Sequence, residues 1–243
     1  MSINEDGDSR MKAAVYAATR ELYPDLAPSI KALLLHSDVE KIFLVIEDDA
    51  FPEWLPPLCE TVNVSGQKLF PRSGPNYDNP WTWMVLMRAA YYRMFPQLDR
   101  ILSIDADAFA LKDISGLWEL DLSRSYLAAV RETSPLDSPE LPYYNVGVMV
   151  QNLDLLRRSG RGDEVLRTLQ KRKWKYPEQD AFNAVCSGGI LGLPREYNAG
   201  RGTEPYGDPV IRHFMGEQAT YRDEPIVRHY RELPWEEVLR CRS

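Results

Sequence analysis

Short apolar runs alternate with longer amphipathic segments along this chain. Strands are predicted at residues 11–18, 41–46, 61–64, 100–105, 126–130, 146–151, 190–193 and 210–214. Helices are predicted at residues 27–37, 79–95, 153–174 and 177–185. Short apolar runs bounded by turn-forming residues are typical of buried strands, and longer periodic segments are typical of helices. The alternation in the first half predicts an α/β fold with a mostly parallel sheet.

The strand predicted at 100–105 runs directly into two aspartates, in the sequence RILSIDADAF of residues 100–109. In an extended chain the side chains of Asp105 and Asp107 point to the same side. Neighbouring carboxylates repel each other unless a cation lies between them. Mg²⁺ and Mn²⁺ prefer such oxygen ligands and often hold phosphates as well. This pattern, at the carboxyl end of a strand where ligands of α/β sheets bind, predicts a metal–phosphate site.

The residues by themselves leave open three other interpretations of the acidic strand ends. The Asp-Ala-Asp sequence could be a solvated turn. Glu47 and Asp49 also follow an apolar run and could bind a metal by the same argument. Phosphatases of the haloacid-dehalogenase type use the first Asp of such a pair as a nucleophile. Against that type, Phe109 stands where those enzymes typically have Thr or Val, and the motif lies near mid-chain rather than on the first strand.

A stripe of side chains at helical spacing precedes the aspartates and predicts a buried helix face. Its members are Trp81, Met84, Val85, Arg88, Tyr92 and Phe95. A guanidinium within such a face needs a charged partner, because an unpaired buried charge is costly, unless its side chain reaches solvent. The candidate partners of Arg88 are Asp105, Asp107 or a ligand bound beside them.

Composition narrows the classes of partner. The 243 residues carry a formal net charge of −7 and 44% hydrophobic residues, which argues against a nucleic-acid backbone or an anionic membrane as main partner. No apolar run reaches the length of a membrane span. Three widely spaced cysteines predict neither a disulfide framework nor a zinc site. With no signal peptide in residues 1–10, which we expect to form a mobile tail, the prediction is a cytoplasmic protein.

Seven motifs in order resemble glycosyltransferase family eight, the retaining enzymes that include bacterial lipooligosaccharide galactosyltransferases and glycogenin. They are ILSIDAD (101–107), KDISGLW (112–118), YLAAVR (126–131), YNVGVMVQN (144–152), YPEQDAFN (176–183), LPREYN (193–198) and HFMG (213–216). The resemblance implies a single GT-A type domain over residues 11–243, with a Rossmann-like, mostly parallel central sheet flanked by helices. It also implies Mn²⁺ or Mg²⁺, a UDP-sugar donor, and a glycan or other hydroxyl acceptor.

The same resemblance implies roles for individual residues. His213, from the family's His-x-x-Gly motif, would join Asp105 and Asp107 as the third metal ligand. Residues near the reacting sugar would be Arg88, Glu132, Asn145, Gln179 and Asp180. Residues that bind the nucleotide or its diphosphate would be Tyr16, Ala17, Ala18, Thr19, Tyr23, Ala106 and Gly216. Gly147 would let the backbone approach closely.

Two departures from the family pattern concern the nucleotide. Thr19 stands where the family has an Asp that meets uracil, and Ala219 where it has a lysine that holds the diphosphate. We hypothesise that Arg212 or Arg222 replaces that lysine, which unchanged nucleotide affinity after alanine substitution of both would contradict. The departures also keep open a non-catalytic relative that binds nucleotide-sugars.

The route to a retained anomeric configuration stays open. Asp180 and Glu132 are candidate nucleophiles for a covalent intermediate, although we favour attack from the face that the phosphate leaves. Residues 221–243 mix five arginines with five acidic residues, so they do not predict an electrostatic membrane anchor. The sequence does not specify the donor sugar, the acceptor or the oligomeric state.

Overall fold

The computed structural model describes residues 11–51, 54–133, 137–216 and 220–242. The tail predicted for residues 1–10 and the position of Ala219 therefore lie outside the described residues. No helix within the described ranges is long and apolar enough to cross a membrane.

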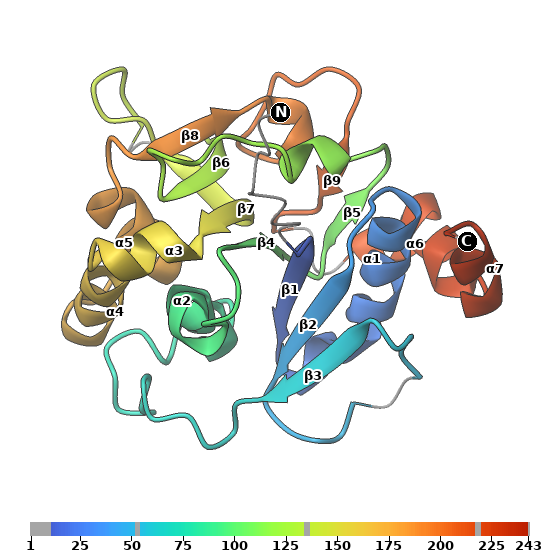
Figure 1. Ribbon diagram of the computed structural model, residues 1–243, viewed down its shortest axis with the longest axis horizontal. Coiled ribbons are helices and arrows are strands. Elements are labelled where there is room, and N and C mark those ends of the chain that lie inside the picture. The colour runs from blue at the N-terminus through green and yellow to red at the C-terminus, as the bar shows by residue number, and fades with distance from the viewer. Residues whose placement is uncertain (1–10, 52–53, 134–136, 217–219, 243) are drawn as a thin grey trace, which may run out of the picture.

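A seven-stranded sheet in the order β3-β2-β1-β4-β7-β6-β8 forms the centre of the protein (Figure 1). Its strands are β1 Ala13–Ala18, β2 Lys41–Ile46, β3 Cys59–Asn63, β4 Arg100–Ile104, β6 Leu127–Arg131, β7 Tyr144–Asn152 and β8 Ile190–Leu193. Strands β3, β2, β1 and β4 run parallel, as do β6 and β8, whereas β7 is antiparallel to both β4 and β6. The prediction of an α/β fold with a mostly parallel sheet is confirmed.

Helices cover both faces of this sheet. Successive residues of a strand point to opposite faces, so one strand contributes apolar side chains to both. In β1, Ala13 and Val15 pack into one hydrophobic cluster, and Ala14, Tyr16 and Ala18 pack into another. The first cluster includes side chains of α4 and α5, and the second includes side chains of α1. The α-helices are α1 Tyr23–Leu35, α2 Tyr91–Met94, α3 Leu153–Arg158, α4 Arg161–Lys171, α5 Pro177–Val185, α6 Pro225–Glu232 and α7 Trp235–Arg240.

A second, two-stranded sheet joins β5 (Ala108–Ala110) to β9 (Ile211–His213) in antiparallel register. The register pairs Ala108 with His213, and the amide of Phe214 donates to the carbonyl of Asp107 at 3.0 Å. This small sheet brings the segment after β4 beside residues more than one hundred positions later. The strand β5 was not predicted, and the strand predicted at 210–214 is confirmed with shorter bounds.

Two predicted helices are wrong in extent. The helix predicted at 79–95 is a 3₁₀-helix, η2 (Trp83–Ala90), followed by the single turn α2. Asn79 holds the preceding turn by accepting from the amide of Trp81 and donating to the carbonyl of Thr82, a local alternative to helical bonding. The helix predicted at 153–174 is broken between α3 and α4 by Gly160, whose φ of 75° is left-handed.

The other predictions differ in smaller ways. Helix α1 begins at Tyr23, four residues before the predicted start, with Pro24 in its first turn. Of the predicted buried stripe, Trp81 is exposed and Val85 is half-buried, whereas the other four members are buried. The helices α6 and α7, which pack against α1, were not predicted.

Arg222 ties the C-terminal region to α1. Its guanidinium contacts both carboxylate oxygens of Asp25, with Nη2 2.6 Å from Oδ2, and the side chain of Asp25 is fully buried. A buried carboxylate that has such a partner depends on it, because removal of the partner leaves an uncompensated charge. The hypothesis that Arg222 binds a diphosphate therefore conflicts with its structural role.

We predict that Arg222→Leu lowers the free energy of unfolding by about 2–4 kcal/mol, because Asp25 remains buried without its cation. Urea denaturation at neutral pH measures the change. Arg228→Leu is the matched control, since Arg228 is exposed in the same region and bonds only the backbone carbonyl of Asp223. Equal unfolding midpoints for the two variants would contradict the prediction.

Candidate active site

Asp105, Asp107 and His213 form a compact triad at the junction of the two sheets. One ligand atom from each lies within 4.8 Å of the others. His213 Nε2 is 3.4 Å from Asp105 Oδ2 and 3.2 Å from Asp107 Oδ1. The two aspartates do meet, but by a turn rather than an extended chain, since the amide of Ala108 donates to the carbonyl of Asp105 at 3.1 Å.

The orientation of the His213 ring is set by Asn198. His213 Nδ1 lies 2.7 Å from Asn198 Oδ1, and Asn198 Nδ2 donates to Asn145 Oδ1 at 2.8 Å. Because Asn198 Oδ1 can only accept, the network places a proton on Nδ1 and turns Nε2 toward the two carboxylates. An imidazole nitrogen and two carboxylates directed at one point are a donor set that fits Mn²⁺ or Mg²⁺.

Gly147 on β7 supports the triad from behind. A Cβ atom there would lie 2.3 Å from His213 Cε1 and 2.7 Å from Asp105 Oδ2. Its carbonyl also accepts from the amide of Asp105 at 2.8 Å. At Gly147 it is thus His213 and Asp105, two of the metal-ligand candidates, that come close to the backbone of β7.

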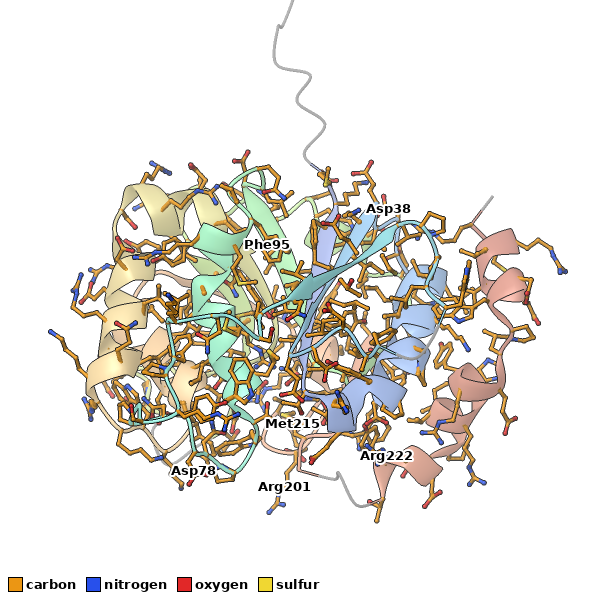
Figure 2. All side chains as sticks on the ribbon, turned by 90° about the horizontal axis from the view of Figure 1, so that it is seen from below. Asp38, Asp78, Phe95, Arg201, Met215 and Arg222 are labelled. Atoms are coloured by element: carbon orange, nitrogen blue, oxygen red, sulfur yellow. The ribbon has the colours of Figure 1, made fainter. Side chains whose placement is uncertain are left out.

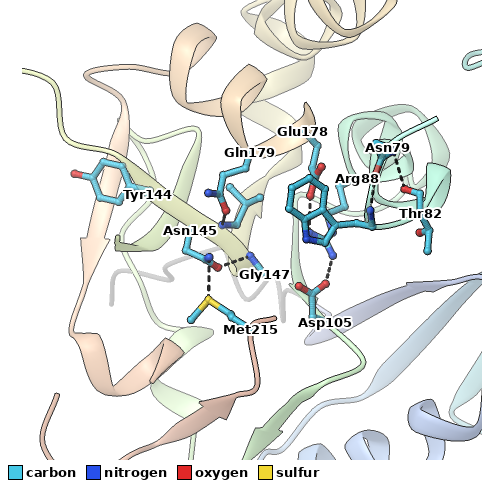
Figure 3. A network of polar contacts seen from close by, with 12 residues as sticks. Asn79, Thr82, Arg88, Asp105, Tyr144, Asn145, Gly147, Glu178, Gln179 and Met215 are labelled. Carbon is cyan, nitrogen blue, oxygen red and sulfur yellow. Dashed lines mark hydrogen bonds and ion pairs between the residues drawn. The ribbon is translucent and has the colours of Figure 1, made fainter. Parts of the chain in front are cut away.

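Arg88 is buried and paired, as its place in the apolar stripe predicted. Its Nη2 contacts Asp105, and its Nη1 donates to Glu178 Oε1 at 3.0 Å (Figure 3). Burial raises the pKa of Glu178, and the nearby charge of Arg88 opposes that shift. The pairing with Glu178 was not predicted, although Glu178 is the first member of the motif that supplied Gln179 and Asp180.

Glu132, Asn145 and Gln179 lie together beside the triad. Glu132 Oε2 accepts from Asn145 Nδ2 at 2.9 Å and from Gln179 Nε2 at 3.0 Å. Burial raises the pKa of Glu132, whereas these two amide bonds lower it, and burial prevails. The structure brings these three predicted residues into one polar network, part of which Figure 3 shows.

Asp180 is buried next to this network, but its carboxylate is fully engaged by the protein. Asp180 Oδ1 accepts from the hydroxyl of Tyr143 at 2.5 Å. Asp180 Oδ2 accepts from the amides of Lys175 at 3.1 Å and Tyr176 at 2.9 Å. Such bonds anchor the start of α5 and hold Asp180 in place.

The two tyrosines predicted to meet the nucleotide, Tyr16 and Tyr23, have buried side chains. The Tyr16 side chain is fully buried, and its hydroxyl accepts from Ser29 at 3.1 Å, so it can contribute to a ligand site only through its backbone. Tyr23 is 1% exposed, and its ring packs 5.3 Å from that of Phe51, which contradicts a stacking role toward a base. Its hydroxyl accepts from the amide of Glu47.

The remaining predicted nucleotide-binding residues are small. Ala18 is buried, Ala17 is half-buried, and Ala106 lies in the turn between the two aspartates. Gly216 has a left-handed φ of 72°. Thr19 is 9% exposed, and its hydroxyl finds no hydrogen-bond partner among the described residues.

The carboxylates at the second acidic strand end accept hydrogen bonds from the protein itself. Glu47 accepts from the Arg20 amide at 2.7 Å and from Trp83 Nε1 at 3.3 Å, and Asp49 accepts from Asn63. Among the residues that the structure describes, the triad is the one group of three potential metal ligands. Arg212, the other hypothetical lysine replacement, donates to the carbonyl of Ala199 and stacks on Phe214.

Comparisons with known sequences match this arrangement to one family. A family model described as glycosyl transferase family 8 matches residues 16–236. The lipopolysaccharide 1,2-glucosyltransferase of Escherichia coli strain K12 is 36% identical over a stretch that covers 47% of this chain and 39% of that protein. Glycosyltransferase GlyF of Streptococcus pneumoniae is 24% identical, with 96% and 64% covered. The chain thus spans less than two thirds of the length of these relatives.

Solved structures share the fold. The galactosyltransferase LgtC, in complex with donor and acceptor sugar analogues, superposes with a TM-score of 0.69 at 16% identity, covering 92% of this chain and 98% of that one. Glycosyltransferase GlyE of Streptococcus pneumoniae superposes with a TM-score of 0.70 at 19% identity, covering 95% and 62%. The GT-A architecture implied by the sequence motifs is therefore confirmed.

We predict that Gly147→Ala lowers the free energy of unfolding by about 1–3 kcal/mol, because the added methyl group must displace His213 or Asp105. Gly192→Ala is the control, since a Cβ there meets its nearest atom, in Tyr144, at an ordinary 3.8 Å. Urea denaturation of both variants measures the difference. A Gly147→Ala variant as stable as Gly192→Ala would show that the triad is not packed against β7.

Proposed function

The chain belongs to glycosyl transferase family 8, and we propose that it transfers a hexose from a nucleotide-sugar to a hydroxyl of a glycan, with retention of configuration and with a divalent cation. The observation that carries this proposal is the triad of Asp105, Asp107 and His213, with its imidazole oriented by Asn198. Nucleotide-sugar donors carry a diphosphate, which such a cation binds.

The site residues have separate tasks in this proposal. The three triad residues would hold Mn²⁺ or Mg²⁺, which stabilises the negative charge that develops on the leaving diphosphate. Arg88 holds Asp105 in place and adds positive charge close to that leaving group. Glu132 accepts both of its amide bonds at Oε2, which leaves Oε1 for a hydroxyl of the donor sugar.

The names of the relatives suggest the substrate classes. A lipopolysaccharide glucosyltransferase and a galactosyltransferase both transfer hexoses, so a hexose donor and a glycan acceptor are the simplest proposal for this chain. A UDP-sugar is the proposed donor, although Thr19 replaces the acid that meets uracil in the family. The phosphatase alternative is not favoured, because Asp105 is held by Arg88 rather than free as a nucleophile.

We predict that UDP and Mn²⁺ together raise the thermal unfolding midpoint more than either alone, and that EDTA abolishes the shift. A ligand at about 100 times its dissociation constant adds roughly 2.7 kcal/mol of stability, which a melting curve resolves. Asp107→Asn should remove the shift. Asp107 is a cleaner choice than Asp105, which also neutralises Arg88.

Asn198→Ala supplies a graded variant for the same measurement. It leaves all three ligands in place but removes the acceptor for His213 Nδ1, so Mn²⁺ affinity should fall by about 10- to 100-fold. No shift of wild-type protein at high UDP and Mn²⁺ would refute the proposed donor, and a shift that survives in Asp107→Asn would refute the proposed metal site.

The engagement of Asp180 supports attack from the face that the diphosphate leaves. A nucleophilic Asp180 would have to give up bonds from Tyr143, Lys175 and Tyr176. Gln179 carries no charge and is a poor nucleophile. These contacts favour a route without a glycosyl-enzyme intermediate.

We therefore predict that rapid acid quench of enzyme with UDP-sugar, followed by peptide mass spectrometry, detects no hexose on Asp180 or Glu132. The same experiment with Gln179→Glu is a sensitive control, since it places a carboxylate in the network where a covalent adduct could accumulate. A hexosylated Asp180 or Glu132 peptide in the wild-type protein would overturn the same-face route.

A further inference from the structure

Two segments far apart in the sequence carry an unusual concentration of positive charge. Residues 65–78 and 165–176 together contain a single carboxylate, Asp78. Their exposed cations, which we call the basic patch, are Lys68, Arg72, Arg167, Lys171, Arg172, Lys173 and Lys175. None of them forms an ion pair with a carboxylate in the described parts of the chain. The net charge of the whole chain is −7, so this surface has the opposite sign to the protein.

Hydrogen bonds hold the two segments side by side. Asn76 Nδ2 donates to the carbonyls of Leu169 and Arg172, each at 2.7 Å, and Asn76 Oδ1 accepts from the amide of Trp174 at 2.9 Å. Lys173 Nζ donates to the carbonyl of Asp78 at 2.8 Å. The two segments that carry the cations are therefore neighbours, joined at Asn76 and Asp78, the second of which Figure 2 labels.

A cavity of about 260 Å³ opens between these segments. Its wall includes the apolar or aromatic side chains of Leu69, Phe70, Tyr77, Leu86 and Leu169, together with Lys68, Gln170 and further residues of the first segment. Apolar walls with a few polar groups are typical of small-ligand sites. A ligand placed there would contact Lys68 and lie between the two segments that carry the basic patch.

The basic patch leads directly into the candidate active site. Tyr176, the last residue of the second segment, precedes the helix α5 that carries Glu178 and Gln179. The Trp81 ring lies 5.2 Å from that of Tyr176 and is 42% exposed. Leu86, in the cavity wall, is two residues before Arg88. A chain-like ligand on the basic patch would therefore lie beside the start of α5, the helix whose Glu178 bonds Arg88.

We propose that the basic patch binds a phosphate-bearing glycan, the acceptor of the reaction. The role of this glycan as acceptor rests on the proposed transferase function. Its phosphate is inferred from charge complementarity with the basic patch. An anionic membrane fits less well, because the apolar surface here is concave. Trp81 is the one large apolar side chain in these segments and their surroundings that the structure shows strongly exposed.

The test is direct binding, by isothermal calorimetry, of a phosphorylated, deacylated lipopolysaccharide core oligosaccharide without metal or nucleotide. We expect binding that weakens by about three- to tenfold in Lys68→Gln/Lys171→Gln, since each exposed charge contributes modestly. Arg228→Gln/Arg231→Gln, which changes net charge equally on α6 at the opposite side of the molecule, should bind like wild type (Figures 1 and 2).

Three outcomes would overturn the proposal: equal affinity for the enzymatically dephosphorylated oligosaccharide, equal weakening in both double variants, or binding only to phosphatidylglycerol vesicles, which would indicate a membrane surface instead. The UDP and Mn²⁺ titration of the wild-type protein is independent of this experiment. A protein that binds UDP with Mn²⁺ but not the oligosaccharide keeps the transferase proposal and loses this one. The converse result would refute the proposed UDP donor and keep the phosphate-binding surface, but it would remove the support for calling the bound glycan an acceptor.

Discussion

The buried guanidinium of Arg88 is the constraint on which the rest of the site depends. It pairs with Asp105 at the end of β4 and with Glu178 on α5. These two ion pairs connect the sheet, η2 and α5. A buried charge of this kind stabilises only with its partners in place, because each partner removed leaves an uncompensated charge. Arg88 thereby fixes Asp105, whose second oxygen faces His213. That pairing positions one of the three metal-ligand candidates and links it to α5.

The two sheets supply the remaining precision. The register of β5 with β9 sets Asp107 beside His213, and the glycine on β7 lets both His213 and Asp105 approach the backbone. Asn198 bonds Nδ1 of the His213 ring, which turns Nε2 toward the two carboxylates. These contacts come from different elements and meet at one point, so a methyl group added at Gly147 would press on two of the three metal-ligand candidates at once.

The sequence predicted those features that depend on local pattern. The apolar run before Asp105 predicted strand β4, and the stripe around Arg88 predicted a buried, paired guanidinium. It could not predict features that depend on which face a side chain takes in the folded sheet. Tyr16 shares the α1 face of β1 with Ala14 and Ala18, so its hydroxyl meets Ser29 in the core. Asn198 was missed because its role exists only once β9 places His213 beside it.

Charge separates the two ends of the proposed reaction. The triad side is rich in carboxylates, so a donor diphosphate needs a cation to bind there. The basic patch instead offers side-chain cations that no described carboxylate neutralises. Screening limits each field to a Debye length of about 8 Å at physiological salt, so the overall negative charge acts only weakly at the patch. A polyanion near this protein is therefore attracted at one surface and repelled elsewhere, which orients it. In the proposed complex this orientation places the phosphate-bearing end on the basic patch, next to the Trp81 and Tyr176 rings that precede α5.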